Sequence, residues 1–220
     1  MLEVIKLKHN TPEWLEFRNG RIGASDAAAV LGRSNWKSNQ ELWEEKIGLR
    51  KHVEFPEDER IGYGAAVEEL NLKLFAVQYA DKYKVKTNKT VVYVKDGFQF
   101  ASLDGELEDI KTGELGIYEG KEVWVDSSLV WEKWKNKIPD QYYCQVLHQL
   151  LTTGRKFVVL NPTFRWIDRG GEIATKTRRI TIRLSDIGIM EDIKYLDEAE
   201  HEFQEYVKRK ERPPRLLPPL

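Results

Sequence analysis

The chain has 220 residues, 41% of them hydrophobic, and its 35 lysines and arginines nearly balance its 36 aspartates and glutamates. This composition is typical of a folded globular protein, and the length is sufficient to bury a sizeable core. The formal net charge of −1 neither indicates nor excludes nucleic-acid binding, because acidic residues can cluster at a metal site while basic residues line a groove.

The cysteine count and the apolar runs exclude further classes of protein. Because Cys144 is the single cysteine, intramolecular disulfides, four-cysteine zinc sites and four-cysteine iron–sulfur clusters are impossible. The N-terminus lacks the apolar segment of a signal peptide, and no run of about 18 apolar residues occurs. We therefore expect a soluble intracellular protein in which Cys144 is a small buried hydrophobic residue.

The first part of the chain is predicted to be helical. Thr11 and Pro12 are residue types that favour the N-cap and the first position of a helix. Ser25 or Asp26 is the expected cap of a second helix, made of small residues, which ends at Gly32.

Two more helices are predicted before the first strands. The third covers the sequence SNQELWEEKIG and stops at Gly48, and the fourth, longer helix covers residues 59–83. The apolar positions that fit helical spacing in the long helix are Val67, Leu70, Leu74, Phe75 and Val77.

Strand-like segments follow, and we expect KTVVYV, GFQFASLDG and IYEGKEVW to form an antiparallel meander. A helix should run from Pro139 to Gly154, and FVVL and TKTRRITIRL should each form a strand. The C-terminal helix should begin at a Ser185 cap, ahead of an extended proline-rich tail at residues 211–220. This order predicts one α/β (α+β) domain over residues 1–220, with a mixed central sheet of about five strands, flanking helices and extra N-terminal helices.

One set of side chains has the composition of a metal site. Glu119 and Lys121 are two residues apart in a predicted strand, so they share a face, and Asp104 ends a strand that we expect beside it. Alone, Asp104-Gly105 is typical of a turn, and Glu119 with Lys121 is typical of a solvated strand. Together, two carboxylates suit Mg²⁺ or Mn²⁺, the Gly120 carbonyl adds a possible ligand, and Lys121 can orient a water molecule. This is chemistry for hydrolysing a phosphodiester.

Several other residues have an ordinary structural explanation beside a functional one. His148 lies on a largely apolar helix and is expected to be a buried, hydrogen-bonded histidine rather than a catalytic one. Trp36, Trp131 and Trp134 either stack on DNA bases or pack in the core, and the sequence leaves both possibilities open. The basic run TKTRRITIR either faces DNA or protects a sheet edge.

The arrangement Asp-x(n)-Glu-x-Lys resembles the signature of the PD-(D/E)xK nuclease superfamily. Further motifs resemble the phage lambda exonuclease and YqaJ-type viral recombinase family. They are WLEFRNGRIGASDAAAVLG, GYGAAVEEL, SLDG, YEGK and QYYCQVLHQLLTTG, in the order of that family and between about residues 12 and 154. Two features depart from the usual pattern: the glycine at position 120, and a longer hairpin between the aspartate and the glutamate. The resemblance implies a restriction-endonuclease-like core.

The resemblance also implies roles for individual residues. Asp104 and Glu119, with the Gly120 carbonyl, would hold the metal, and Lys121 would position the water. Glu68 would reach a second ion directly or through water. Gln145 would touch the scissile phosphate or the water, although Gln141 and Gln149 on the same helix are alternatives. The implied cofactor is Mg²⁺, with Mn²⁺ possible, at two ions per site.

A separate group is implied to bind the 5′-terminal phosphate: Arg18 and Ser25, with Arg21 as a possible contributor. The implied activity is 5′-to-3′ digestion of one strand of linear duplex DNA, leaving 3′ overhangs for recombination by strand annealing. Ring-shaped homotrimers, a single-strand annealing protein as partner and the cytoplasm of a bacterial host are implied as well, for a phage or prophage gene product. A PD-(D/E)xK endonuclease and a non-catalytic DNA-end-binding module are the alternatives.

Overall fold

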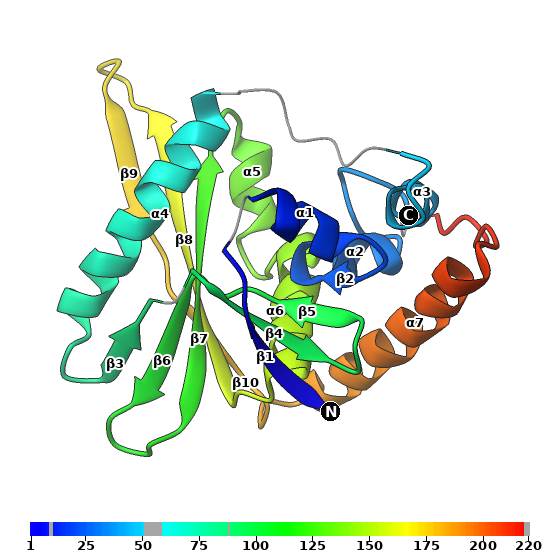
Figure 1. Ribbon diagram of the computed structural model, residues 1–220. Coiled ribbons are helices and arrows are strands. Elements are labelled where there is room, and N and C mark those ends of the chain that lie inside the picture. Colours follow the sequence, from blue (N-terminus) through cyan, green and yellow to red (C-terminus); the bar gives the residue numbers. More distant parts are fainter. Residues whose placement is uncertain (9–10, 51–58, 88, 218–220) are drawn as a thin grey trace.

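The computed structural model describes residues 1–8, 11–50, 59–87 and 89–217. For residues 59–66 it describes the backbone alone. The chain forms two mixed sheets with flanking helices (Figure 1). The strands are β1 (Leu2–Lys6), β2 (Ile22–Gly23), β3 (Tyr83–Lys86), β4 (Val91–Lys95), β5 (Gln99–Ala101), β6 (Gly105–Asp109), β7 (Leu115–Trp124), β8 (Phe157–Ile167), β9 (Ile173–Thr177) and β10 (Ile180–Arg183). The helices are α1 (Pro12–Arg18), the 3₁₀ turn η1 (Ala24–Asp26), α2 (Ala27–Val30), α3 (Asn39–Lys46), α4 (Glu59–Gln78), α5 (Ser128–Lys133), α6 (Asp140–Thr153) and α7 (Ile189–Arg209). The predicted mixed α/β fold class is confirmed.

The larger sheet has six strands in the order β10-β8-β7-β6-β3, with β9 also paired to β8. Strands β7 and β8 are parallel, and the other pairs are antiparallel. β8 is buried along most of its length, as a strand covered on both faces should be. The long central pair β7 and β8 therefore forms a rigid base for side chains near the middle of β7.

The prediction that the three strand-like segments form a meander in one sheet is wrong. Strands β4 and β5 pair with each other in a separate sheet of four strands, in the order β1-β4-β5-β2. The segment GFQFASLDG leaves this sheet after Ala101 and enters the larger sheet at Gly105. All three residues of β5 are buried, so this short strand lies between packed layers and cannot continue as a solvent-facing hairpin. β1 was not predicted, although its sequence LEVIK contains the two β-branched residues Val4 and Ile5.

The run TKTRRITIRL forms two strands instead of the predicted one. Both β9 and β10 pair with the same edge of β8, and the break lies opposite Asn161 and Pro162. Pro162 has no N–H to donate to the ladder, and its carbonyl accepts instead from the N–H of Arg178 at 2.9 Å. The proline in β8 explains why its edge partner is interrupted.

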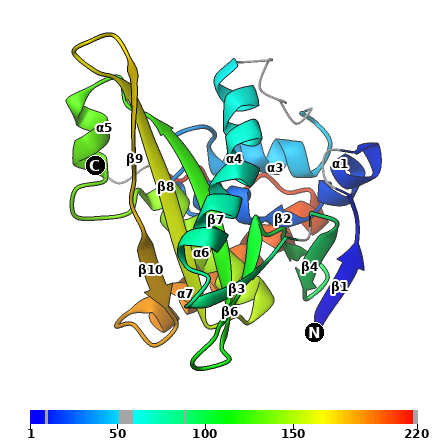
Figure 2. The ribbon, with the colours of Figure 1, turned by 90° about the vertical axis from the view of Figure 1, so that its left-hand side faces the viewer.

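Helix α6 lies between the two sheets, while α4 covers the opposite side of the larger sheet (Figures 1 and 2). One hydrophobic cluster contains Ala101 of β5, Leu147 of α6 and Leu160 of β8, so the two sheets share a core through this helix. Gly154 ends α6 with a φ of +68°, as its sequence predicted. Side chains on different faces of α6 can therefore reach either sheet.

The predicted helix starts have mixed outcomes. The Thr11 side chain accepts from the N–H of Trp14, with Pro12 following it, so this cap is confirmed. In the second helix the Asp26 carboxylate accepts from the N–H of Gly23 at 3.1 Å, ahead of α2. The Ser185 cap is wrong, because α7 begins after Gly188 and the preceding turn is closed by the Asp186 side chain bonding the N–H of Arg183.

Helix α4 is shorter than predicted and buries a different face. It ends at Gln78, and Tyr83 begins β3. Leu72 and Phe75 pack in the core, whereas Leu70, Leu74 and Val77 are 55%, 51% and 79% exposed. Three of the five apolar positions that fit helical spacing are therefore on the surface of this helix, spaced so that they form one row.

The proline-rich tail has no regular secondary structure between 211 and 217, and it packs against α3. Asn39 donates to the Pro214 carbonyl at 2.7 Å and accepts from the N–H of Leu216 at 3.1 Å. Gly32 faces this tail: a Cβ atom there would lie 2.7 Å from the Cβ of Leu216. Residues 218–220 lie outside the described residues. In the part of the chain that the structure describes, no helix is long and apolar enough to cross a membrane.

Candidate active site

The β6–β7 hairpin brings Asp104 and Glu119 together. Gly105 pairs with Tyr118 in the antiparallel ladder, and continuing this register puts Asp104 opposite Glu119. Side chains of opposite residues lie on the same face of an antiparallel pair. The Asp104 Oδ2 atom accepts from the N–H of Gly120 at 2.9 Å, which fixes the carboxylate beside the middle of β7.

Glu119 is 1% exposed, and three side chains donate to its carboxylate. Lys121 Nζ and Gln145 Nε2 both donate to Oε1, the second at 2.6 Å, and Gln149 Nε2 donates to Oε2 at 2.6 Å. Gln145 and Gln149 are four residues apart on α6, so they share a face of this helix. The structure therefore brings both glutamines to Glu119, whereas the family motif by itself offers Gln149 only as an alternative to Gln145.

The charges at this site are unbalanced. Burial raises the pKa of Asp104 well above its ordinary value, and the neighbouring Glu119 carboxylate raises it further. Burial lowers the pKa of Lys121, but Glu119 and Asp104 outweigh this and hold it above its ordinary value. Two carboxylates thus face one ammonium group. A further cation at this position would relieve the repulsion between the carboxylates.

Glu68 does not join this pair closely. Its side chain on α4 is about one-third exposed and lies 3.6 Å from the Nζ atom of Lys89. Its charge is near enough to contribute to the raised pKa of Asp104. Among the described residues, no group of three or more His, Cys, Asp or Glu side chains is close enough to hold a metal ion. Direct ligation through Glu68 is therefore not shown by the side-chain arrangement.

The residues present fit a divalent cation of the Mg²⁺ type. Asp104 and Glu119 supply hard carboxylate oxygens, and their excess negative charge matches such an ion. The Oε1 atom of Gln149, beside Glu119, is buried without a hydrogen-bond partner among the described residues. A Cβ atom at Gly120 would lie 3.7 Å from Asp104 Oδ2, in ordinary contact, so the site has room for a side chain at this position.

A second polar cluster contains Arg18 and Ser25, the two residues that the family resemblance assigns to the 5′-terminal phosphate. Arg18 Nη2 lies 3.5 Å from Ser25 Oγ and 3.7 Å from Asp26 Oδ1. Asp26 also binds the Lys46 ammonium at 2.7 Å, and although burial raises the pKa of Asp26, Lys46 and Arg18 hold it below its ordinary value. Two cations thus surround one carboxylate, next to the exposed hydroxyl of Ser25. This arrangement suits an anionic group such as a phosphate.

Lys46 was missed in the sequence, where it had the appearance of an ordinary basic residue in the last turn of α3. Its ammonium is 5% exposed and bonds Asp26 and, at 3.4 Å, the Arg18 carbonyl. Arg21 lies apart from this cluster. Its guanidinium donates to the carbonyls of Phe17 and Gly97 at 3.0 and 3.3 Å.

The burial of the remaining candidate residues distinguishes structural side chains from exposed ones. His148 is fully buried and bonded at both ring nitrogens, so the prediction of a structural histidine is confirmed. Cys144 is 3% exposed, as expected. Trp131 stacks on Phe164 with ring centroids 4.7 Å apart, and Trp134 is 3% exposed. Trp36, in contrast, is 66% exposed.

This fold is similar to that of solved alkaline exonucleases. LHK-Exo from Laribacter hongkongensis superposes with a TM-score of 0.57 at 21% identity, over 91% of this chain and 97% of that chain. LHK-Exo in complex with dAMP has a TM-score of 0.52 at 23% identity, with the same coverage. A phage-related exonuclease from Haemophilus somnus 129PT has a TM-score of 0.52 at 15% identity, over 86% of this chain and 96% of that chain. At these identities the likeness establishes the fold.

The family follows from the sequence match. Residues 13–156 match the YqaJ-like viral recombinase domain, and the chain belongs to that family. A Bacillus subtilis (strain 168) protein, uncharacterized protein YqaJ, is 31% identical over 146 residues, which cover 66% of this chain and 43% of that protein. The chain thus matches less than half of the length of this curated relative.

Proposed function

We propose that the protein is a metal-dependent DNA exonuclease that degrades the 5′-ended strand of linear duplex DNA in the 5′-to-3′ direction. The observation that carries this proposal is the convergence of Asp104, Glu119 and Lys121 on one face of the β6–β7 hairpin. Membership of the YqaJ-like viral recombinase family and a fold shared with alkaline exonucleases support the reaction class. The complex of LHK-Exo with dAMP supports a deoxynucleotide product.

Each residue of the site has a distinct part in this reaction. Asp104, Glu119 and the Gly120 carbonyl would hold Mg²⁺ or Mn²⁺, and Glu68 would hold a second ion through water. Bound there, the metal supplies Lewis acidity to the scissile phosphate and lowers the pKa of the attacking water. Lys121, kept charged by its two carboxylate neighbours, orients that water and stabilises the charge that develops on the phosphate. Gln145 contacts the scissile phosphate or the water, while Gln149 holds Glu119 in place.

The preference for DNA ends rests on the Arg18 and Ser25 cluster. An arginine can bind two phosphate oxygens at once, and Ser25 offers an exposed hydroxyl beside it. The excess positive charge from Arg18 and Lys46 over Asp26 favours a doubly charged terminal phosphate over an internal diester. We therefore propose that this cluster binds the 5′-terminal phosphate.

We further propose that the protein assembles into a homo-oligomer, a ring trimer by family resemblance, and acts with a single-strand annealing protein in the cytoplasm of a bacterial host. The exposed row Leu70, Leu74 and Val77 on α4 supports a contact between copies, because such a row leaves apolar area in water. Light scattering of the purified protein gives the subunit number, and Leu74→Glu should reduce it. Wild-type protein that is monomeric at all concentrations tested would contradict the assembly.

The activity is tested by incubating linear duplex DNA, labelled at the 5′ or the 3′ end, with and without Mg²⁺. We expect 5′-labelled mononucleotides to appear first, only with the metal and faster from 5′-phosphorylated ends. Closed circular duplex should remain intact. Cutting of circles would support the endonuclease alternative, and end binding without digestion would support the non-catalytic one.

A further inference from the structure

Trp36 is the exposed member of the seven tryptophans, all of which lie within the described residues. The Trp36 side chain is 66% exposed, and tryptophan is enriched at binding interfaces because it combines a large apolar ring with a polar N–H group. The two tryptophans that the sequence offered as alternatives, Trp131 and Trp134, pack against Phe164 instead. Exposure therefore singles out Trp36 as the candidate for contact with a ligand.

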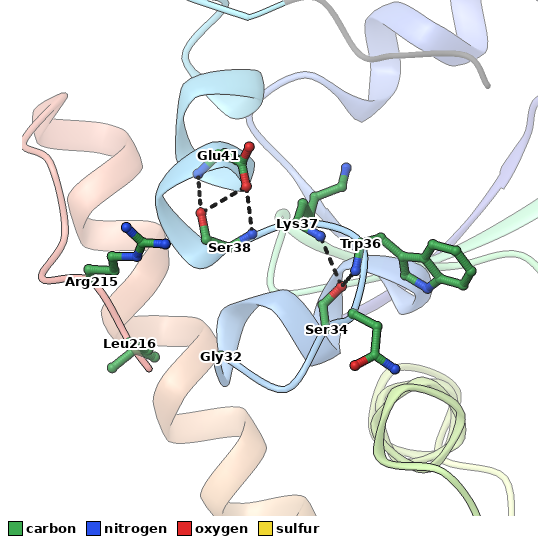
Figure 3. Close-up of a pocket in the computed structure, with 9 residues that line it drawn as sticks. Gly32, Ser34, Trp36, Lys37, Ser38, Glu41, Arg215 and Leu216 are labelled. Atoms are coloured by element: carbon green, nitrogen blue, oxygen red, sulfur yellow. Dashed lines mark hydrogen bonds between the residues drawn. The ribbon is translucent and has the colours of Figure 1, made fainter. Parts of the chain in front are cut away.

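The loop that carries Trp36, between α2 and α3, is held by hydrogen bonds. Ser34 Oγ accepts from the N–H groups of Trp36 and Lys37 at 3.1 and 3.3 Å, and Ser38 and Glu41 cap α3 reciprocally. Figure 3 shows these bonds, with the indole of Trp36 pointing away from Arg215 and Leu216. The indole thus projects from an ordered loop, which lowers the entropy lost when a ligand stacks on it.

This loop is attached to the helix that carries the active-site glutamines. Asn35 donates to Gln141 at 2.6 Å, and Arg33 pairs with Asp140 at 2.8 Å, so the loop contacts the first turn of α6. Gln145 is one helical turn further on, about 6 Å along the axis, and it donates to Glu119. The loop that carries Trp36 is therefore joined to the helix whose next turn holds a glutamine of the candidate active site.

The chemistry of the substrate indicates what the indole contacts. Inside a duplex each base is already stacked between its neighbours, whereas an unpaired base at a strand end exposes a face. Aromatic side chains stack on such faces whatever the base. We propose that Trp36 stacks on an unpaired base at the 5′ end of the substrate strand and so positions that end. This inference rests on the proposed exonuclease function.

The stacking is tested by a double-mutant cycle in which both the protein and the DNA end are varied and binding is measured. Binding of a labelled, 5′-phosphorylated duplex end is measured by fluorescence anisotropy in EDTA, so that no digestion is needed. The DNA has either normal nucleotides or abasic residues at its first two 5′ positions, with unchanged phosphates. The proteins are wild type, Trp36→Ala, Trp36→Phe and, as a matched control for losing an exposed apolar side chain, Leu49→Ala, which is 72% exposed in the wild type.

We expect Trp36→Ala to weaken binding of the normal end about tenfold, Trp36→Phe less, and Leu49→Ala not at all. With the abasic end, wild type and Trp36→Ala should bind alike, because the stacking partner is gone. The inference is overturned if Trp36→Ala binds the normal end as wild type does, or if it weakens both ends equally. If the wild type digests DNA but this coupling is missing, the stacking fails and the proposed function stands. If the wild type neither binds nor digests ends, both fail.

Discussion

Helix α6 contributes to two polar groups, and these groups differ in how their charges are compensated. In the first group Gln145 and Gln149 reach Glu119, where two carboxylates share the single ammonium of Lys121. In the second group His148 binds the Glu200 carboxylate at 2.7 Å and the Phe100 carbonyl at 2.9 Å.

The His148 group is a closed network, by which we mean that each of its polar side chains has a hydrogen-bond partner within the group. Gln99 donates to the second oxygen of Glu200 at 2.8 Å and to Asp197 at 2.8 Å, and Asp197 is also bound by Lys95. Both ring nitrogens of His148 face oxygen atoms, and the Glu200 carboxylate raises the pKa of His148 and so favours the charged imidazolium. A buried network stabilises a fold when every member is satisfied, whereas a centre with uncompensated charge is suited to bind an ion. One helix therefore contributes side chains both to a structural network and to the candidate active site.

Removing the cation from the reactive centre should have the largest effect on activity and little effect on folding. We expect Lys121→Ala to lower the digestion rate by about 10²–10⁴-fold, because the water and the developing phosphate charge lose their cationic partner. The rate is measured on linear 5′-phosphorylated duplex, with circular dichroism to establish folding. Lys73→Ala, an exposed lysine of α4, is the control. A folded Lys121→Ala protein with full activity would contradict the proposed mechanism.

Removing the cation from the closed network should instead damage the fold. We expect His148→Ala to lower the free energy of unfolding by about 3–5 kcal/mol, since it leaves the buried Glu200 carboxylate without its cationic partner. Urea denaturation measures the change. His201→Ala on the exposed side of α7 is the matched control and should cost less than about 1 kcal/mol. Equal losses for the two histidines would remove the distinction between the two groups of α6.

The charge on His148 predicts a pH dependence of stability. Burial lowers the pKa of His148, but the Glu200 carboxylate and the bond to the Phe100 carbonyl outweigh burial and raise the pKa above its ordinary value. The folded state then holds the proton more tightly than the unfolded state. Its stabilisation is fully present below about pH 6.5 and is lost as the pH rises through the folded-state pKa.

Urea denaturation of wild type and His148→Gln between pH 6 and 9 measures this contribution as a difference between the two proteins. We expect the advantage of the wild type to shrink as the pH rises. An advantage that grows with pH, or that stays constant across the window, would show that His148 is not protonated in the folded protein.

Removing a charge at the partly exposed edge of the closed network should have the smallest effect on the free energy of unfolding. The Lys95–Asp197 pair spans 3.1 Å and is 24% and 31% exposed, so solvent screens it. We expect Asp197→Asn to change the free energy of unfolding by less than about 1 kcal/mol, measured by the same denaturation. A loss as large as that of His148→Ala would mean that the network acts as one unit out to its surface.

Much of this molecule follows from local sequence, and the exceptions have physical causes. Caps such as Thr11 and stop signals such as Gly154 act within a few residues, so their positions were predictable. The face that α4 buries was not predictable from the sequence. Leu70 and Leu72 are both apolar, and only the sheet beneath the helix decides which of them packs in the core. The break between β9 and β10 depends on Pro162 in a strand distant in sequence.

The candidate site divides in the same way. The sequence by itself determined the Glu-x-Lys face, since side chains two apart in a strand point the same way, and it named Asp104 and Gln145 through family motifs. Only the tertiary structure decided that Gln149 also holds Glu119, that Lys46 joins the Arg18 cluster, and that Glu68 stands apart. It also decided that Trp36 is exposed while Trp131 and Trp134 are packed. Alternation along a strand is a local property, whereas burial and contact between helices depend on how distant segments of the chain pack together.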